Sequence, residues 1–289
     1  MELCRATLSR APFLPAAPPS LPVRDFRKRR VVCLSSGKSE STESPKDTQM
    51  VVSVTGATGF IGRRLVQKLL ADKHKVRVLT RSITKARFVF PVENFPEIII
   101  AEEEEWKKCI EGSNAVVNLA GMPISTRWSP EIKKEIMQSR INVTSKVVDL
   151  INHTNAEVRP SVLAQVKLKS LMRLVLQEMT TYQRFSWIHL DDLVNLICQS
   201  LTNPSYKGVI NGTAPNPVRL SEMCDQLGQV IGRPSWLPVP DFAIKAVLGE
   251  GASIVLEGQR VLPAKAKELG FSYKYPYVKD ALKAIVREL

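Results

Sequence analysis

Residues 51–62 read VVSVTGATGFIG, and this stretch decides the fold. A short run of β-branched residues is followed at once by Gly56, Gly59 and Gly62, and then by the amphipathic sequence RRLVQKLLADK. A buried strand, a tight glycine turn and a helix in this order form the unit that binds dinucleotides. The stretch therefore predicts nucleotide binding. The alternative is an ordinary strand that ends in glycines.

The glycines of this turn are spaced G-x-x-G-x-x-G and have separate expected roles. One allows the sharp turn, one lets the backbone approach a pyrophosphate, and one lets the helix pack close to the strand. The phosphates would lie over the free N–H groups at the start of the helix, where the helix dipole favours negative charge. The expected cofactor-binding residues here are Gly56, Thr58, Gly59, Phe60, Ile61 and Gly62.

A second strand is expected over residues 75–81, which read KVRVLTR. An NAD-binding protein carries a carboxylate near the end of this strand, where it holds the ribose 2′-hydroxyl. This chain has Arg81 there, with Lys85 close behind. A guanidinium cannot accept a hydrogen bond from a hydroxyl, but it can bind a 2′-phosphate through two N–H groups. Arg81 therefore favours NADP(H) over NAD(H), unless it is a surface arginine that caps a helix beginning near Ser82.

Two further strands are expected over residues 98–101 and 115–121, and the second reads AVVNLAG. Small residues at its end let the backbone pass beside a nicotinamide and its ribose. The expected cofactor-binding residues therefore also include Asn118, Ala120 and Gly121. A long helix should follow, with Ser129 as N-cap and Pro130 in its first turn, ending near Asn152. This alternation predicts an α/β fold with a Rossmann-like, doubly wound parallel sheet.

The net charge of +13 does not indicate nucleic-acid binding. Part of the basic excess lies in the first fifty residues, and no basic stripe carries interleaved aromatic residues. The five cysteines are scattered without a C-x-x-C pair, and the glutamates at 102–105 are expected in a solvated loop. We therefore predict neither a metal site nor a disulfide framework. No apolar run approaches the ~18–20 residues of a membrane span.

Residues 1–48 have the composition of an organelle transit peptide and disordered leader. Arginine and proline are frequent, acidic residues are sparse, and no continuous apolar segment of a secretory signal is present. The sequence VVC at 31–33 follows basic residues and resembles a plastid processing site. We predict a chloroplast protein. A mitochondrial leader and a disordered tail of a cytosolic protein are the alternatives.

Several motifs together resemble one family. They are TGATGFIG, LTRS, VVNLAG and SRINVT in the first half, and FSWIHLDDLVNLI, GVINGTAPNPVRLSEM and LEGQRVLPAKAKELGF in the second. They are similar to the extended short-chain dehydrogenase/reductases, and more narrowly to their atypical, SulA-like epimerase branch of bacteria and plastids. The resemblance covers residues 50–163 and 185–289. It implies a stromal protein, associated with the inner envelope and linked to plastid division, but it does not give the reaction.

The domain plan follows from the strand pattern and the resemblance together. An NAD(P)-binding Rossmann domain is expected over residues 49–200 and a C-terminal substrate domain over residues 201–289. Residues 164–184 diverge from the family, which has there a fifth strand ending in small hydroxyl residues, a Tyr-Tyr-Gly sequence, a helix and a sixth strand. The replacement has helical spacing. We therefore expect one amphipathic helix and a sheet shortened after the fourth strand. Alternative splicing, a gene-model error, a real deletion and a chain that does not fold all remain open.

No catalytic residue is identified by the sequence. Reductases of this superfamily use a Tyr as proton donor and a Lys four residues later. The one such spacing here, Tyr275 to Lys279, contains Pro276 and lies near the chain end. His189 is expected to pin a loop, with Asp191 capping a helix that starts near Leu193, although a catalytic His–Asp pair is the alternative.

We therefore expect an NADP(H)-binding protein in which turnover is doubtful. The alternative is an active NADP-dependent oxidoreductase or epimerase acting on a sugar-nucleotide-like or small carbonyl substrate. Asn211 should line the cleft between the domains. The last helix has apolar residues at 278, 281, 282, 285 and 289. We expect it to pack on its own domain, and peripheral binding to an anionic membrane is the functional alternative. The sequence leaves a homo-oligomer open.

Overall fold

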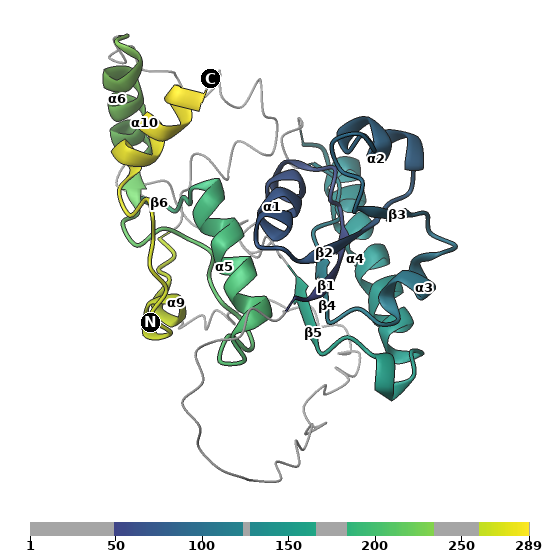
Figure 1. The fold of residues 1–289 in the computed structure, drawn as a ribbon. Coiled ribbons are helices and arrows are strands. Elements are labelled where there is room, and N and C mark those ends of the chain that lie inside the picture. The colour runs from purple at the N-terminus through teal and green to yellow at the C-terminus, as the bar shows by residue number, and fades with distance from the viewer. Residues whose placement is uncertain (1–48, 124–127, 166–183, 234–259, 289) are drawn as a thin grey trace, which may run out of the picture. The chain divides into compact units, whose positions relative to one another are not determined.

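The structure, a computed structural model, describes residues 49–123, 128–165, 184–233 and 260–288 (Figure 1). The predicted leader lies outside the described residues. So does the helical pattern of residues 166–183. The described residues nevertheless include the whole glycine turn and every strand of the main sheet.

Five parallel strands form the main sheet, in the order β3-β2-β1-β4-β5. Their bounds are Val51–Thr55 for β1, Lys75–Leu79 for β2, Ile99–Ala101 for β3, Ala115–Asn118 for β4 and Val162–Gln165 for β5. The chain runs outward from β1 to β3 and then crosses to the other side of β1 with β4. In open α/β sheets, ligands bind at the carboxyl ends of the strands where the order reverses. The strand order of this sheet reverses between β1 and β4, so the carboxyl ends of these two strands are the expected position of a ligand.

The sheet continues one strand further than expected. β5 pairs in parallel with β4, from Ala115 against Val162 to Asn118 against Gln165. Ala164 and Gln165, the first residues of the divergent segment, therefore complete a strand. Val162 and Ala164 pack against the core beneath the sheet. The alternation of inward-facing residues is thus preserved. The expectation of a sheet shortened after the fourth strand is therefore wrong, because a fifth strand is present.

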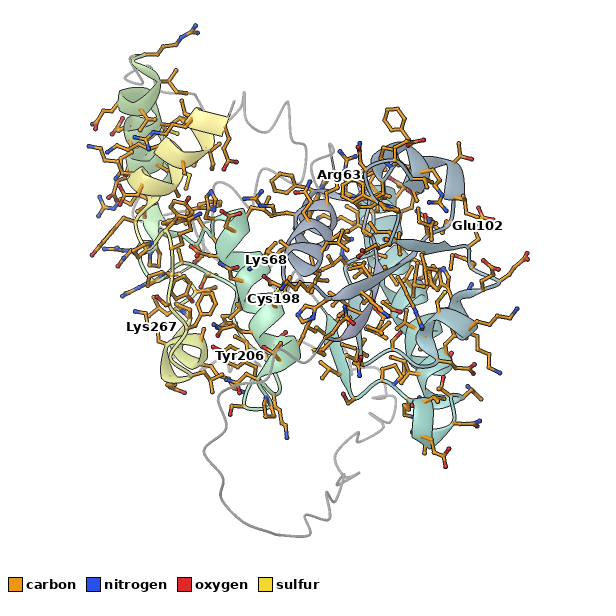
Figure 2. The ribbon with its side chains drawn as sticks, viewed as in Figure 1. Arg63, Lys68, Glu102, Cys198, Tyr206 and Lys267 are labelled. Carbon is orange, nitrogen blue, oxygen red and sulfur yellow. The ribbon has the colours of Figure 1, made fainter. Side chains whose placement is uncertain are left out.

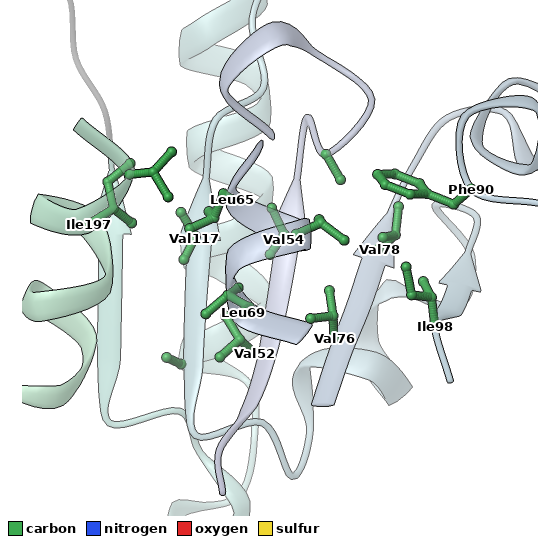
Figure 3. Packing of buried hydrophobic residues seen from close by; sticks show 14 of the residues in the cluster. Val52, Val54, Leu65, Leu69, Val76, Val78, Phe90, Ile98, Val117 and Ile197 are labelled. Carbon is green, nitrogen blue, oxygen red and sulfur yellow. The ribbon is translucent and has the colours of Figure 1, made fainter. Parts of the chain in front are cut away.

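Helices cover both faces of the sheet. On one face lie α1 (Phe60–Ala71), α2 (Ile83–Val89) and α5 (Leu190–Thr202), whose apolar residues enclose the valines of β1 and β2 (Figure 3). On the other face, α3 (Trp106–Ile110) and α4 (Pro130–Asn152) bury Trp106, Ile110 and Val147 against the strands. The predicted doubly wound α/β fold is confirmed.

Of the two predicted helix N-caps, that of α4 is confirmed and that of α5 is wrong. Ser129 caps α4 as predicted, its Oγ accepting a hydrogen bond from the Ile132 N–H at 3.3 Å. A short 3-10 turn (Ala156–Val158) then leads from α4 towards β5. The predicted cap of α5 is wrong, because the N-cap is His189, whose Nδ1 accepts from the Asp191 N–H at 3.2 Å. The Asp191 carboxylate is instead paired with Arg64 of α1.

The C-terminal residues form a second cluster of elements. β6 (Arg184–Phe185) pairs antiparallel with β7 (Val218–Arg219), and α6 (Leu220–Ile231), α9 (Ala264–Glu268) and α10 (Val278–Glu288) follow. α10 lies beside α6 (Figure 1).

The apolar side of α10 is only partly covered. Its residues Val278 and Ala281 are buried in a cluster with Trp187 and Val218, whereas Ile285 is 43% exposed. The first turns of α10 therefore pack on neighbouring elements of the chain, as expected. Within the described residues, the structure contains no helix of the length and apolarity that a membrane span requires.

Candidate functional site

The glycine turn has the geometry of a phosphate-binding loop. Gly56 has a positive φ of 69°, and a Cβ there would lie 2.7 Å from the Ala120 backbone nitrogen. A Cβ on Gly62 would lie 2.3 Å from the Gly56 carbonyl oxygen. Gly56 thus makes the sharp turn and the close approach to the loop after β4, and Gly62 lets α1 pack on the turn. These distances leave no room for a side chain at either position.

The start of α1 presents backbone rather than side chains. Gly59 is its N-cap, with no side-chain hydrogen bond, and the first turn contains no acidic residue. Arg63, in that turn, donates from Nε to the Thr58 carbonyl oxygen at 2.9 Å (Figure 2). Phe60 is 78% exposed, whereas Ile61 packs against the core. The six predicted turn residues therefore lie together, and an anion could reach the free N–H groups at the start of α1.

The end of β4 is built from a buried polar network. Asn118 is 3% exposed, and its Oδ1 accepts from Thr55 Oγ1 at 2.6 Å and from the Ala120 N–H at 3.3 Å. Its Nδ2 donates to Thr144 Oγ1 at 3.2 Å. Both ends of this amide are therefore used within the protein. Asn118 therefore holds the loop after β4, with Ala120 next to Gly56, in position.

Gly121 is set against Arg140 of α4. A Cβ at Gly121 would lie 3.0 Å from Arg140 Cγ. The Arg140 guanidinium donates to the carbonyl oxygens of Met122 and Ile136, each at 3.0 Å. Burial lowers the pKa of Arg140 from its ordinary value. This side chain holds the loop against α4. Arg140 lies in the motif SRINVT, but that motif alone does not indicate this contact.

Arg81 lies where the sequence predicts it, just beyond the end of β2. Its side chain is exposed, and it has no hydrogen-bond or ion-pair partner within the described part of the chain. The turn around it is fixed, because Thr80 Oγ1 accepts from the Ser82 N–H at 3.2 Å and Ser82 Oγ accepts from the Lys85 N–H at 3.3 Å. α2 begins at Ile83 with Ser82 as its N-cap. The guanidinium is therefore available to a ligand from a rigid turn.

Two residues at the same edge of the sheet were not predicted. Gln165, the last residue of β5, donates from Nε2 to Thr144 Oγ1 at 2.6 Å, which extends the Asn118 network across the sheet. Glu102, the first residue after β3, accepts a hydrogen bond from the Ile83 N–H at 3.0 Å. The only signal for either in the sequence was its position directly after a strand.

His189 and its neighbouring carboxylates form a structural junction. Asp191 accepts from Arg64 at 2.8 Å and from Lys274 at 3.2 Å. Burial acts to raise the pKa of Asp191, but these two cations outweigh it and hold the pKa below its ordinary value. Asp192 is fully buried and accepts from the Lys274 and Tyr275 N–H groups at 2.8 and 3.0 Å. Both carboxylates thus join the chain near residue 274 to α5.

His189 makes structural contacts in this junction. It is buried, and its ring lies 4.0 Å, centroid to centroid, from that of Tyr275. Burial lowers the pKa of His189, and the neighbouring carboxylates oppose the shift. Its Nδ1 is occupied by the Asp191 N–H, as described above. The structural interpretation of His189 is therefore supported. His189 caps α5, the role that was predicted for Asp191, and Asp191 instead joins α5 to Arg64 and Lys274.

The remaining candidate residues have other partners. Lys279 Nζ is 3.5 Å from Gln229 Oε1, so the Tyr275–Lys279 spacing does not form a catalytic pair. Asn211 donates from Nδ2 to the Leu262 carbonyl oxygen at 3.2 Å. Tyr182, which has Ser186 rather than a lysine four residues later, lies outside the described residues. Among those residues, no group of three His, Cys, Asp or Glu could hold a metal ion.

Comparison with solved structures agrees with this fold. The crystal structure of human epimerase family protein SDR39U1 (isoform2) with NADPH superposes with a TM-score of 0.69, covering 83% of this chain and 100% of that chain. The sequence identity of this pair is 24%, so this likeness concerns the fold.

Comparison with sequences gives the family. The model of the NAD dependent epimerase/dehydratase family matches residues 52–163, and a domain of unknown function, DUF1731, matches residues 239–285. Epimerase family protein YfhF of Bacillus subtilis (strain 168) is 27% identical over 83% of this chain and 99% of its own length. The Arabidopsis thaliana epimerase family protein SDR39U1 homolog, chloroplastic, is 56% identical over 84% of this chain and 89% of its own length.

The alignment with the Arabidopsis protein also shows a gap. It extends over 308 residues, although this chain has only 289 in all. The relative therefore contains internal residues that have no counterpart here. The family model ends at residue 163, close to where the sequence diverges. With the glycine turn, the strand order and these matches in agreement, the chain belongs to the NAD dependent epimerase/dehydratase family.

Proposed function

We propose that this chain binds NADP(H), with the diphosphate at the glycine turn and the 2′-phosphate at Arg81. The observation that carries the proposal is the start of α1, where a glycine N-cap leaves backbone N–H groups uncapped beside a close-packed turn. A helix N-terminus of this kind binds phosphate oxygens through its N–H groups and its dipole. The human relative crystallised with NADPH has the same fold, which supports the assignment.

Arg81 supports the phosphorylated form of the cofactor. The turn after β2 carries no Asp or Glu over residues 80–85 that could accept from a 2′-hydroxyl. An arginine at this position can donate two parallel hydrogen bonds to a phosphate. Its exposure on a rigid turn means that binding would cost little rearrangement.

Substitution of Arg81 tests the cofactor assignment. Arg81→Met should weaken NADPH binding about 10- to 100-fold, because it removes charge-assisted hydrogen bonds to the phosphate, and should leave NADH binding unchanged. Arg87→Met is the matched control, since Arg87 is an exposed arginine of α2 and carries the same charge. Equal losses in both variants, or an equal loss for NADH, would remove Arg81 from the site.

We further propose that the chain binds its cofactor without reductase turnover. In the described residues, Tyr275 contacts His189 and Lys279 contacts Gln229. The sequence of residues 164–184 also diverges from the one that the family resemblance implies. The alternative is an active oxidoreductase or epimerase on a sugar-nucleotide-like or small carbonyl substrate. Steady NADPH consumption with a panel of carbonyl compounds would establish that alternative.

We propose that the protein acts in the chloroplast stroma, with a role in plastid division at the envelope. The printed name of the Arabidopsis relative, which includes "chloroplastic", supports the compartment. The arginine-rich composition of residues 1–48 agrees with import. A fluorescent fusion of residues 1–50 should enter plastids, and diffuse cytosolic signal would contradict the location. Plants lacking the protein should have altered chloroplast number if the division role is right.

A further inference from the structure

Glu102 lies next to the turn that carries Arg81. β2 and β3 are parallel neighbours, and the Thr80 N–H donates to the Ala101 carbonyl oxygen at 2.9 Å just beyond their ends. Glu102 follows directly, and its Oε1 accepts from the Ile83 N–H at 3.0 Å (Figure 2). The Glu102 carboxylate, which follows β3, is therefore held by the backbone N–H of Ile83, two positions after Arg81.

The neighbouring glutamate has a different environment. Glu103 forms an ion pair with Lys146 of α4 at 2.6 Å, and that ammonium also lies 5.1 Å from the centre of the Trp106 ring. Glu102 has a backbone N–H as partner and no cation within the described residues. Glu103 is therefore paired with a side-chain cation, whereas the Glu102 carboxylate is held by a backbone N–H.

The position of Glu102 affects one form of the cofactor more than the other. The Arg81 and Ile83 backbones lie at most about 7 Å apart, because they are two residues apart in the chain. A 2′-phosphate that Arg81 holds against this turn would interact with the negative charge of Glu102, since the Debye length at physiological ionic strength is about 8 Å. NADH has an uncharged hydroxyl at that place, so the repulsion would concern NADP(H) alone.

We infer that Glu102 is a specificity-determining residue, which weakens binding of the 2′-phosphate in opposition to Arg81 and so sets the ratio of NADPH to NADH affinity. The inference rests on the proposed function, because it needs the 2′-phosphate at Arg81. Glu102 is a positioning residue as well, since it fixes the N–H of Ile83. An amide at position 102 could still accept that hydrogen bond, which separates the effect of charge from that of structure.

The test compares Glu102→Gln with Glu103→Gln in the full chain. Both variants remove one negative charge from adjacent positions, and NADPH and NADH are each titrated by nucleotide fluorescence at low and high salt. Glu102→Gln should tighten NADPH binding about two- to fivefold at low salt and leave NADH binding unchanged. The gain should shrink at high salt because ions screen exposed charges. Glu103→Gln should leave the ratio of the two affinities unchanged.

The outcomes distinguish failure of the inference about Glu102 from failure of the proposed NADP(H) binding. If wild type binds NADPH and Glu102→Gln matches Glu103→Gln, or binds both nucleotides more weakly, the inference about Glu102 is overturned and the proposed function survives. If folded wild-type protein binds no NADPH, the proposed function itself fails. Thermal unfolding of both variants checks that the turn is intact, and a lower midpoint for Glu102→Gln together with weaker binding counts against the inference.

Discussion

At the scale of single residues, the glycines of the turn carry the site because of contacts and not merely because of flexibility. Gly56 and Gly112 both have a φ near +70°, but only Gly56 has backbone atoms where a Cβ would lie. A side chain at Gly112 would meet nothing within 4 Å. A comparison of substitutions at Gly56 and Gly112 therefore separates the cost of backbone strain from the cost of steric clash.

We predict that Gly56→Ala destabilises the protein more than Gly112→Ala. Both variants incur the cost of a left-handed alanine, about 1–2 kcal/mol. Gly56→Ala adds the cost of forcing the loop after β4 away, about 1–3 kcal/mol, and should abolish NADPH binding. Urea unfolding and nucleotide titration measure the two effects. Similar stability in the two variants would show that the close approach at Gly56 is not structural.

Caps illustrate what could be predicted at this scale. Ser129 was correctly identified as the cap of α4, since Ser-Pro before a helix is a local signal. The cap of α5 was not, because Asp191 is occupied by Arg64, a residue 127 positions away. Local sequence cannot reveal a partner that only the packing of α1 on α5 supplies.

At the scale of elements, α1 and α5 are joined by that ion pair. The Asp191 side chain is 12% exposed and the Arg64 side chain 43%, so the pair is partly shielded from water. Because α1 also carries the glycine turn at its start, the pair connects the cofactor helix to the chain that leads into the C-terminal elements. Lys274 adds a second cation from that chain.

The depressed pKa of Asp191 predicts a pH dependence of stability. A carboxyl group with a lower pKa in the folded state stabilises the fold fully above its unfolded pKa of about 3.9, and this contribution is lost as the pH falls through the folded value. Asp191→Asn should therefore cost about 1–2 kcal/mol at neutral pH, and the difference from wild type should shrink below about pH 4.

Asp72→Asn is the control for this experiment, because Asp72 forms an exposed pair with Lys68 within one helix. It should cost less than about 0.5 kcal/mol. The measurement is the free energy of unfolding in denaturant between neutral and acidic pH. A difference for Asp191→Asn that stays constant down to the acid limit would contradict the role assigned to the pair.

The first four strands were predicted to within a few residues. β1 to β4 are short runs of β-branched residues, and such runs identify buried parallel strands. β5 was not predicted, because the divergent segment that begins at residue 164 has a helical spacing, which is a local signal. Pairing with β4 is a long-range interaction, and it determines the conformation as far as Gln165.

At the scale of the whole molecule, the sequence was sufficient for the fold class and for the position of the glycine turn. The glycines and the alternation of strands and helices follow from local patterns. The network from Thr55 through Asn118 and Thr144 to Gln165 could not be predicted, because its members come from β1, β4, α4 and β5 and meet only when the sheet is assembled. The same is true of Glu102 beside Ile83.

The central claim is that this fold binds a dinucleotide phosphate although residues 164–184 diverge from the family. The most direct test is titration of the purified full chain with NADPH, with circular dichroism confirming that the sample is folded. The account predicts saturable binding of NADPH that is tighter than that of NADH, without NADPH consumption when carbonyl compounds are added. A folded sample that binds neither NADPH nor NADP⁺ would contradict the account.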